Sequence, residues 1–174
     1  MTVPIRDAQQ HDADACAAIY RPYVTDTAIS FETEPPTPAQ MCERIQQARH
    51  THAWLVAETE GRVVGYAYGG PFKTRAAYQW SCEVSVYLDR EHRGRGIGRA
   101  LYTELFERLA DRGYQTAFAG MTLPNPASHG LHRAMGFEPA GVYRGVGWKN
   151  GSWHDVAWFQ RPLAPAGSPP AQLR

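Results

Sequence analysis

Four segments of the chain have the features of helices. Met41, Ile45 and Ala48 recur at the spacing of one helical face. They follow residues 37–40, Thr-Pro-Ala-Gln, which combine a capping box with proline at the first helical position. The predicted helices run from Asp7 through Tyr20, with a stop at Pro22, from Thr37 through Ala48, from about Gly98 to Gly113, and from Pro126 to Met135.

Shorter apolar runs bounded by turn residues predict strands. Residues 60–61, Glu-Gly, and 150–151, Asn-Gly, separate two pairs of such runs, which should form hairpins. The order is strand, two helices, three antiparallel strands, helix, strand, helix and two strands, which predicts an α+β domain with a mixed, mostly antiparallel central sheet flanked by helices. The predicted strands are a short extended start at Ile5, the segments 53–58, 63–68, 80–88 and 115–121, and two strands flanking residues 149–152.

Length and composition narrow the protein class. We expect one domain over residues 1–163 of the 174, followed by a disordered Pro-rich tail, 164–174. A net charge of +1 argues against a general nucleic-acid binder, and no apolar run could span a membrane or serve as a signal peptide. The three cysteines are widely spaced, which argues against a disulfide framework and favours a cytoplasmic protein.

Four arginines and three glycines lie between Arg90 and Arg99, where an apolar run gives way to the third predicted helix. Glycines leave the first N–H groups of a helix open to a ligand, and the helix dipole favours an anion there. The arginines add charge for further phosphate oxygens. The segment therefore predicts a site for a phosphorylated cofactor, and the alternative is an Arg/Gly-rich surface turn.

The spacing of this loop restricts the cofactor. The third glycine, Gly98, comes one residue early for a dinucleotide fingerprint, and the Gly-Lys-Ser/Thr end of a nucleoside-triphosphate loop does not occur in the chain. The arrangement Arg/Gln-x-x-Gly-x-Gly/Ala at residues 93–98 instead resembles the pyrophosphate loop of the GNAT acyltransferase superfamily, which binds acetyl-CoA.

Further segments extend the resemblance to one branch of that superfamily. Residues 125–137 are similar to its Asn-x-x-Ala-x-x-Leu-Tyr-x-x-x-Gly-Phe helix, with Ser128 for alanine and His132 for tyrosine. The region from about Ile5 to Arg161 resembles phosphinothricin N-acetyltransferases. This implies the GNAT fold, acetyl-CoA as co-substrate, and acetylation of the α-amine of phosphinothricin or of methionine sulfoximine or sulfone. The other segments that carry the resemblance are 31–35, 70–78, 83–87 and 151–156.

Glu83 is the candidate general base. It lies in an otherwise apolar predicted strand, where partial burial would raise its pKa and suit it to accept a proton from the amine. Strand alternation places Glu83 on one face with Ser81 and Ser85, and Cys82 on the other. Cys82 is therefore expected to be a core thiol and not an acyl-cysteine nucleophile. The alternative for Glu83 is an edge-strand side chain in solvent.

His132 resembles a histidine of phosphinothricin acetyltransferases and could protonate or orient the departing sulfur. The alternative is a packed helix histidine bonded to the backbone. His129 lies three residues earlier, but no third ligand has a suitable spacing, so no metal is expected.

The resemblance also implies which residues hold the cofactor. Backbone groups near Ser85–Tyr87 would pair with the pantetheine arm and receive the oxyanion at a splayed or bulged strand. Asn125 would hold the arm further along, and it can also cap the helix that it precedes. The expected cofactor-binding residues are Ser85, Val86, Tyr87, Arg93, Gly94, Arg95, Gly96, Ile97, Gly98 and Asn125.

The substrate side has several candidates. Arg75, with Lys73 as the weaker choice, could pair with a carboxylate or phosphinate. Phe31, Tyr78 and Val156 resemble pocket-lining positions of the family, and each could equally be a loop or core residue.

The family pattern leads us to expect glycine beside the substrate, and Thr122 departs from that pattern. A β-branched hydroxyl there narrows the pocket and leaves the identity of the substrate open. Two other functions compete: a non-catalytic CoA-binding module, and an acetyltransferase for a protein lysine, an N-terminus or a polyamine. The retention of Glu83, His132 and Arg75 favours an enzyme over the module. The strand Trp153–Trp158 and the loop with Phe31 indicate a small closed pocket, which favours an amino acid over a protein substrate.

Trp148, Trp153 and Trp158 lie close together near the end of the predicted sheet. Aromatic patches are favoured at interfaces, and members of the family that the chain resembles commonly pair. We therefore expect a homodimer, with an ordinary aromatic core as the alternative.

Overall fold

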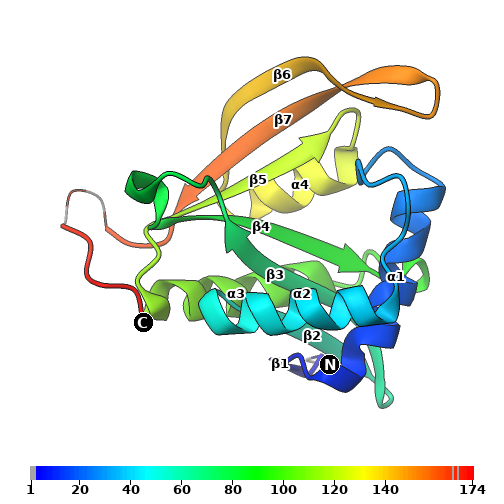
Figure 1. The fold of residues 1–174 in the computed structure, drawn as a ribbon, viewed down its shortest axis with the longest axis horizontal. Helices are drawn as coiled ribbons and strands as arrows, with labels where there is room; N and C mark the ends of the chain where they lie inside the picture. Colours follow the sequence, from blue (N-terminus) through cyan, green and yellow to red (C-terminus); the bar gives the residue numbers. More distant parts are fainter. Residues whose placement is uncertain (1–2, 166, 168) are drawn as a thin grey trace.

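The computed structural model describes residues 3–165, 167 and 169–174 (Figure 1). The described residues form one seven-stranded sheet and four α-helices, so the predicted α+β architecture is confirmed. The strands are β1 (Ile5–Asp7), β2 (Trp54–Thr59), β3 (Arg62–Pro71), β4 (Ser81–Leu88), β5 (Thr116–Thr122), β6 (Glu138–Lys149) and β7 (Ser152–Pro162). The helices are α1 (Ala13–Thr25), α2 (Pro38–Thr51), α3 (Ile97–Arg112) and α4 (Pro126–Ala134), with short 3₁₀ turns at Gln10–Asp12, Ala76–Tyr78 and Arg90–His92.

The strands follow the order β1-β2-β3-β4-β5-β7-β6, and the only parallel pair in the described sheet is β4 with β5. That pairing joins Ser81–Glu83 to Thr116–Phe118 and goes no further. β4 continues to Leu88 beside β3, whereas β5 continues to Thr122 beside β7. The two strands therefore diverge, as Figure 1 shows, and the splayed strand that the sequence led us to expect is present.

Alternating side chains of the sheet enter two separate cores. Leu55 and Ala57 of β2 pack with α3, whereas Trp54 and Val56 pack with α1 and α2. This period of two is what a strand buried on both faces requires. The sheet is thus covered on both faces along β2 and β3, while β7 and β6 lie at the other end of the strand order (Figure 1).

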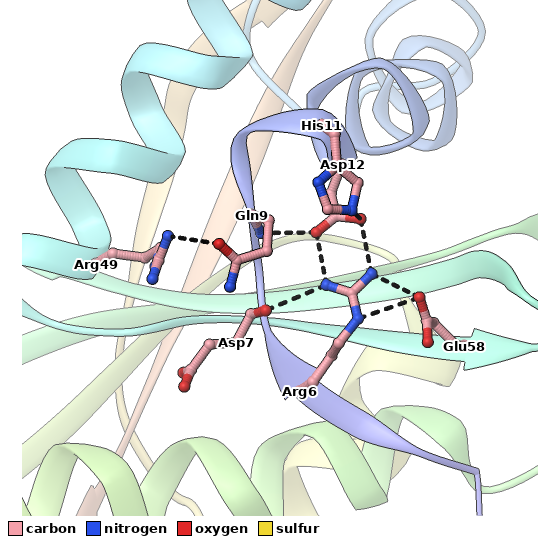
Figure 2. Close-up of polar contacts among 7 residues, drawn as sticks. All are labelled: Arg6, Asp7, Gln9, His11, Asp12, Arg49 and Glu58. Carbon is pink, nitrogen blue, oxygen red and sulfur yellow. Dashed lines mark hydrogen bonds and ion pairs between the residues drawn. The ribbon is translucent and has the colours of Figure 1, made fainter.

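The limits of α1 differ from the prediction. Asp7 pairs with Leu55 in the sheet, so it cannot begin a helix. The helix instead begins after Asp12, whose carboxylate accepts hydrogen bonds from the Gln9 N–H at 2.7 Å and from the Arg6 guanidinium at 2.7 and 2.8 Å (Figure 2). The same guanidinium bonds to Glu58 on β2, which fastens the start of α1 to the sheet.

Pro22 was predicted to end α1, but the helix continues to Thr25. Proline removes one backbone hydrogen bond from a helix. Tyr23 and Val24, in the next turn, are buried, and their packing offsets that loss. Tertiary burial here overrides the local stop signal.

Other local predictions are confirmed. The capping box at Thr37 and Gln40 is formed, with bonds of 3.2 and 2.9 Å. Gly113 ends α3 with a φ of 104°. Asn150 and Gly151 have φ values of 52° and 75°, as a two-residue turn between β6 and β7 requires.

Described residues at the end of segment 164–174, which we expect to be a disordered tail, make hydrogen bonds to the domain. The Trp80 indole N–H donates to the Ala171 carbonyl at 2.9 Å, and the backbone N–H of Arg174 donates to the Arg112 carbonyl at 3.0 Å. Leu173 packs beside Gly113 at the end of α3. The described residues at the end of the tail thus lie against the domain.

Candidate active site

A cavity of about 450 Å³ lies where α3 and α4 begin beside the end of β4, and we call it the loop cavity. It brings together three segments that the sequence separates: the end of β4, the glycine loop 93–98 and the start of α4. Arg95 is not among its lining residues, and Ser85 and Tyr87 line the neighbouring cavity described below. The expected cofactor residues that do line it are Val86, Arg93, Gly94, Gly96, Ile97, Gly98 and Asn125.

The glycine loop has the geometry of an anion site. Gly94 and Gly96 have φ values of 74° and 79°, which favour glycine, and a Cβ on either would meet no described protein atom within 4 Å. The first hydrogen bond of α3 runs from the Ala100 N–H to the Gly96 carbonyl. The backbone N–H groups that precede Ala100 therefore lie at the start of α3 without an acceptor inside the helix. This open cradle suits a pyrophosphate.

Asn125 occupies its predicted position. Its side-chain oxygen accepts a hydrogen bond from the Ser128 N–H at 3.1 Å, so it caps α4. It also lines the loop cavity, so the capping and cofactor roles are compatible.

The sequence did not reveal Tyr23 as a residue of this cavity, because Pro22 was predicted to end its helix. The Tyr23 hydroxyl donates to the Leu88 carbonyl at 2.6 Å, and its ring lies 5.0 Å from the Arg93 guanidinium. Tyr23 thus fastens the end of β4 and places a cation beside the glycine loop.

A second cavity of about 530 Å³ contains Glu83, and we call it the Glu83 cavity. Phe31, Thr122 and Val156, three of the expected substrate residues, line it. Thr122 and Val156 are register partners across β5 and β7, which places them side by side. The remaining lining residues are Tyr20, Ile29, Ser30, Glu32, Tyr68, Ser85, Tyr87, Gly120, Tyr143, Val146 and Trp158.

Glu83 has the environment expected of a base. Burial raises the pKa of its carboxyl above the ordinary 4.5, and the positive charge of Lys73 opposes that rise. Cys82 points into the core on the other face of β4, where burial raises the pKa of its thiol to about 12. The predicted alternation is confirmed, and the Cys82 thiol lies away from the cavity.

Arg75 and Tyr78 do not line the Glu83 cavity, contrary to expectation. They lie with Lys73 in the loop that follows β3, which lines a separate cavity of about 540 Å³ beside His52 and Tyr114. Lys73 is the member of the group that approaches the site: its ammonium lies 6.0 Å from the ring of Trp158, which lines the Glu83 cavity.

His132 is buried and lines neither the loop cavity nor the Glu83 cavity. Its Nδ1 lies 2.7 Å from the Ser128 carbonyl oxygen, and its Nε2 lies 3.2 Å from the Tyr102 hydroxyl. Burial lowers the pKa of the imidazole, while the bond to Ser128 opposes that change. The geometry is that of the packed helix histidine bonded to the backbone.

The sequence did not identify Tyr20, Tyr68 and Trp158 as residues of the Glu83 cavity. Tyr68 pairs with Ser85 across β3 and β4, and both lie on the Glu83 face of the sheet. The alternation of side chains along residues 81–88 could have identified which of them share the Glu83 face. It could not have shown that Tyr68 of β3 lies beside them.

None of the helices in the described residues is both long and apolar enough to cross a membrane. Within the same residues, no group of three or more His, Cys, Asp or Glu side chains is placed to hold a metal.

The acetyltransferase (GNAT) domain family matches residues 5–158. The chain belongs to the GNAT acetyltransferase family. The predicted GNAT fold and the expectation of an enzyme are thereby confirmed. In this GNAT chain, the splay of β4 and β5 and the glycine loop before α3 form the two adjoining cavities.

Known relatives agree with the resemblance. This GNAT chain is 39% identical to the phosphinothricin N-acetyltransferase of Streptomyces viridochromogenes, over 99% of the chain and 93% of that protein. It is 35% identical to the L-methionine sulfoximine/L-methionine sulfone acetyltransferase of Pseudomonas aeruginosa, over 98% of the chain and all of that protein. A phosphinothricin acetyltransferase from Sinorhizobium meliloti, solved in complex with AcCoA, has a TM-score of 0.94 and 38% identity, over 98% of this chain and 94% of its own.

Proposed function

We propose that this chain transfers the acetyl group of acetyl-CoA to the α-amine of a small amino acid, such as phosphinothricin or methionine sulfoximine or sulfone. The observation that carries the proposal is that the two cavities adjoin. Ile29 lines both, and residues 85–88 of β4 alternate between them. A thioester reaching along the loop cavity would meet an amine in the Glu83 cavity at this strand. The names of the relatives support the substrate class, and the AcCoA-bound neighbour supports the cofactor.

The glycine loop binds the pyrophosphate through the N–H groups at the start of α3, with Arg93 adding charge. The diverging part of β4 binds the pantetheine arm, because its backbone groups on the β5 side have no strand partner beyond Glu83. Asn125 lies at the same cavity and holds the arm further along.

Glu83 acts as the general base. An ammonium cannot attack a thioester, so the amine must first lose a proton, and the Glu83 carboxylate accepts it directly or through one water molecule. The raised pKa makes this carboxylate a better proton acceptor. The neutral nitrogen then forms a bond to the acetyl carbon.

The Val86 N–H stabilises the resulting oxyanion, because alternate N–H groups of β4 point away from β3 and toward the side where β5 has diverged. The nitrogen, now bonded to the acetyl carbon, gives up its second proton as the carbon–sulfur bond breaks, and the CoA thiolate takes up one proton. The proton that Glu83 accepted first is released to solvent, so the step balances. Both ring nitrogens of His132 are engaged by Ser128 and Tyr102. We therefore assign His132 to holding α4 against α3, and not to protonating the sulfur.

Lys73 supplies positive charge for the anionic end of the substrate. The charged residues that line the Glu83 cavity are both acidic, Glu32 and Glu83, so an amino acid needs a cation from outside that set. Phe31, Val156 and Thr122 contact the side chain of the substrate.

A homodimer in the cytoplasm completes the proposal. Trp148 and Trp153, 59% and 64% exposed, stack edge to face on the β6–β7 hairpin with ring centroids 5.4 Å apart. Large exposed aromatic side chains of this kind are typical of an interface. A cytosolic setting agrees with three cysteines that are all free.

The test is to mix purified protein and acetyl-CoA with phosphinothricin, methionine sulfoximine, methionine sulfone, a peptide and a polyamine. Thiol release is followed, and the product is identified by mass. We expect release with the three amino acids and a mass increase of one acetyl group at the amine. Acetylation of only the peptide or polyamine would contradict the substrate class, and acetyl-CoA binding without turnover would identify a non-catalytic module.

A further inference from the structure

The loop between α1 and α2, residues 26–37, forms one wall of the Glu83 cavity. Ile29, Phe31 and Glu32 of this loop line the cavity. The loop has neither helix nor strand to hold it, and the ring of Phe31 is 40% exposed. Its position must therefore be set by contacts with other elements.

Arg44 of α2 bonds to the Glu32 carboxylate at 2.7 and 2.9 Å, and Lys149, the last residue of β6, bonds to the backbone of the loop. Its side chain is buried, and its ammonium donates to the carbonyls of Val24, Ser30 and Glu32 at 2.7, 2.6 and 2.8 Å. An ammonium has three donors, and all three are used here. The acceptors lie at the end of α1 and on both sides of Phe31, so one side chain of the hairpin fixes the backbone of the loop.

Gly147, two residues earlier on β6, receives the Phe31 ring. A Cβ built on Gly147 would lie 2.8 Å from Cδ2 of Phe31 and closer still to Cε2 and Cζ. Gly147 pairs with His154 of β7, and the His154 ring lies 6.3 Å from the Phe31 ring. The absence of a side chain at Gly147 therefore creates the space that the aromatic ring occupies.

The same hairpin carries Tyr143, Val146, Val156 and Trp158, which also line the cavity. We propose that Lys149 and Gly147 are positioning residues that lock the Phe31 loop to the β6–β7 hairpin and thereby set the width of the amino-acid pocket. This inference rests on the proposed function for its kinetic consequence. Its structural consequence can be measured without activity: the loop depends on Lys149 and Gly147 in addition to the bonds that Arg44 and Tyr20 make to Glu32.

The steric half of the proposal is tested by Gly147→Ala in two backgrounds. In the wild-type background the added methyl group displaces the Phe31 ring. We expect the KM for the amino acid to rise roughly tenfold or more, with little change in kcat or in the KM for acetyl-CoA. In the Phe31→Ala background, the same Gly147→Ala change should have no further effect, because the ring is gone.

The matched control is Gly141→Ala on the same strand, where a Cβ would meet no described atom within 4 Å. It should leave both KM values within about twofold of the wild type. An equal effect of Gly147→Ala with and without Phe31 would overturn the steric half of the proposal.

The polar half is tested by Lys149→Met, which keeps much of the length of the side chain and removes the three donors. We expect amide hydrogen exchange in residues 26–37 to become at least about tenfold faster, with exchange in the glycine loop 93–98 unchanged. Unchanged exchange in residues 26–37 would overturn the role of Lys149. This readout stands even if the wild type acetylates none of the tested amino acids, an outcome that would contradict only the proposed function.

Discussion

The parallel register between β4 and β5 ends at the pair Glu83–Phe118. On one side of this pair the two strands are joined by backbone hydrogen bonds, and on the other side they diverge. Glu83 therefore lies at the point of divergence, with its side chain in one cavity, and the part of β4 that no longer pairs with β5 leads to the other cavity. The proposed base thus lies beside the part of β4 to which we assign the pantetheine arm.

Replacement of Glu83 by glutamine should lower kcat by about 10²–10⁴-fold, because the amide keeps the shape and removes the proton acceptor. Acetyl-CoA affinity should remain within a few-fold of wild type. Burial raises the pKa of Glu83 above 4.5, and only the ionised form accepts a proton. The wild-type kcat should therefore fall as the pH drops through that pKa, and the residual kcat of the variant should lack this fall. Near wild-type turnover at neutral pH in the variant would place the base elsewhere.

Valine at Gly96 should weaken acetyl-CoA binding by roughly two orders of magnitude, measured by calorimetry. The φ of 79° disfavours a β-branched residue, and the new side chain would project where phosphates approach the helix. Gly61→Val is the matched control, because Gly61 has a φ of 73° in the β2–β3 turn and also has no described atom within 4 Å of a built Cβ. Equal losses of affinity in the two variants would mean that strain alone is responsible.

Thr122 should select among substrate head groups. It is buried beside Val156 in the Glu83 cavity, where it takes space from the substrate. Thr122→Gly should raise kcat/KM for phosphinothricin relative to methionine sulfone, since the phosphinate is the bulkier head. Thr122→Ser keeps the hydroxyl and separates its effect from that of the methyl group. Unchanged ratios in Thr122→Gly would remove Thr122 from the pocket.

Light scattering at micromolar concentration should give twice the chain mass of 19.4 kDa. Trp148→Ser with Trp153→Ser should shift the mass toward one chain, because it removes the two most exposed large aromatic side chains of the hairpin. A wild-type monomer would refute the dimer.

Acid should destabilise the fold through His52. Burial, and to a lesser extent the charge of Arg112, lowers the pKa of His52 from 6.5 to about 4. Between these values the unfolded chain binds a proton that the native protein does not. The free energy of unfolding should therefore fall as the pH drops through this window, by on the order of 3 kcal/mol over its full width. Urea unfolding of His52→Phe from pH 7 to pH 4 should show a smaller decrease than wild type, and identical decreases would contradict the assignment.

The sequence by itself determined the features that depend on neighbours a few residues away. The capping box at Thr37 and Gln40, the Asn150-Gly151 turn and the αL end of α3 at Gly113 each use local hydrogen bonds or one backbone angle. The geometry of the glycine loop belongs to this group, because it is a property of one loop and one helix end. The motifs around these features were enough to predict the fold and the family.

Only the tertiary structure decided how distant segments combine. It made Asp7 a strand residue through Leu55, and it carried α1 past Pro22 through the burial of Val24. It also placed Arg75 outside the Glu83 cavity and bonded Lys149 to carbonyls more than 100 positions earlier in the chain. These outcomes depend on which surfaces are buried against each other once the sheet has formed. No local pattern contains that information, because packing and desolvation act between residues that are neighbours only in space.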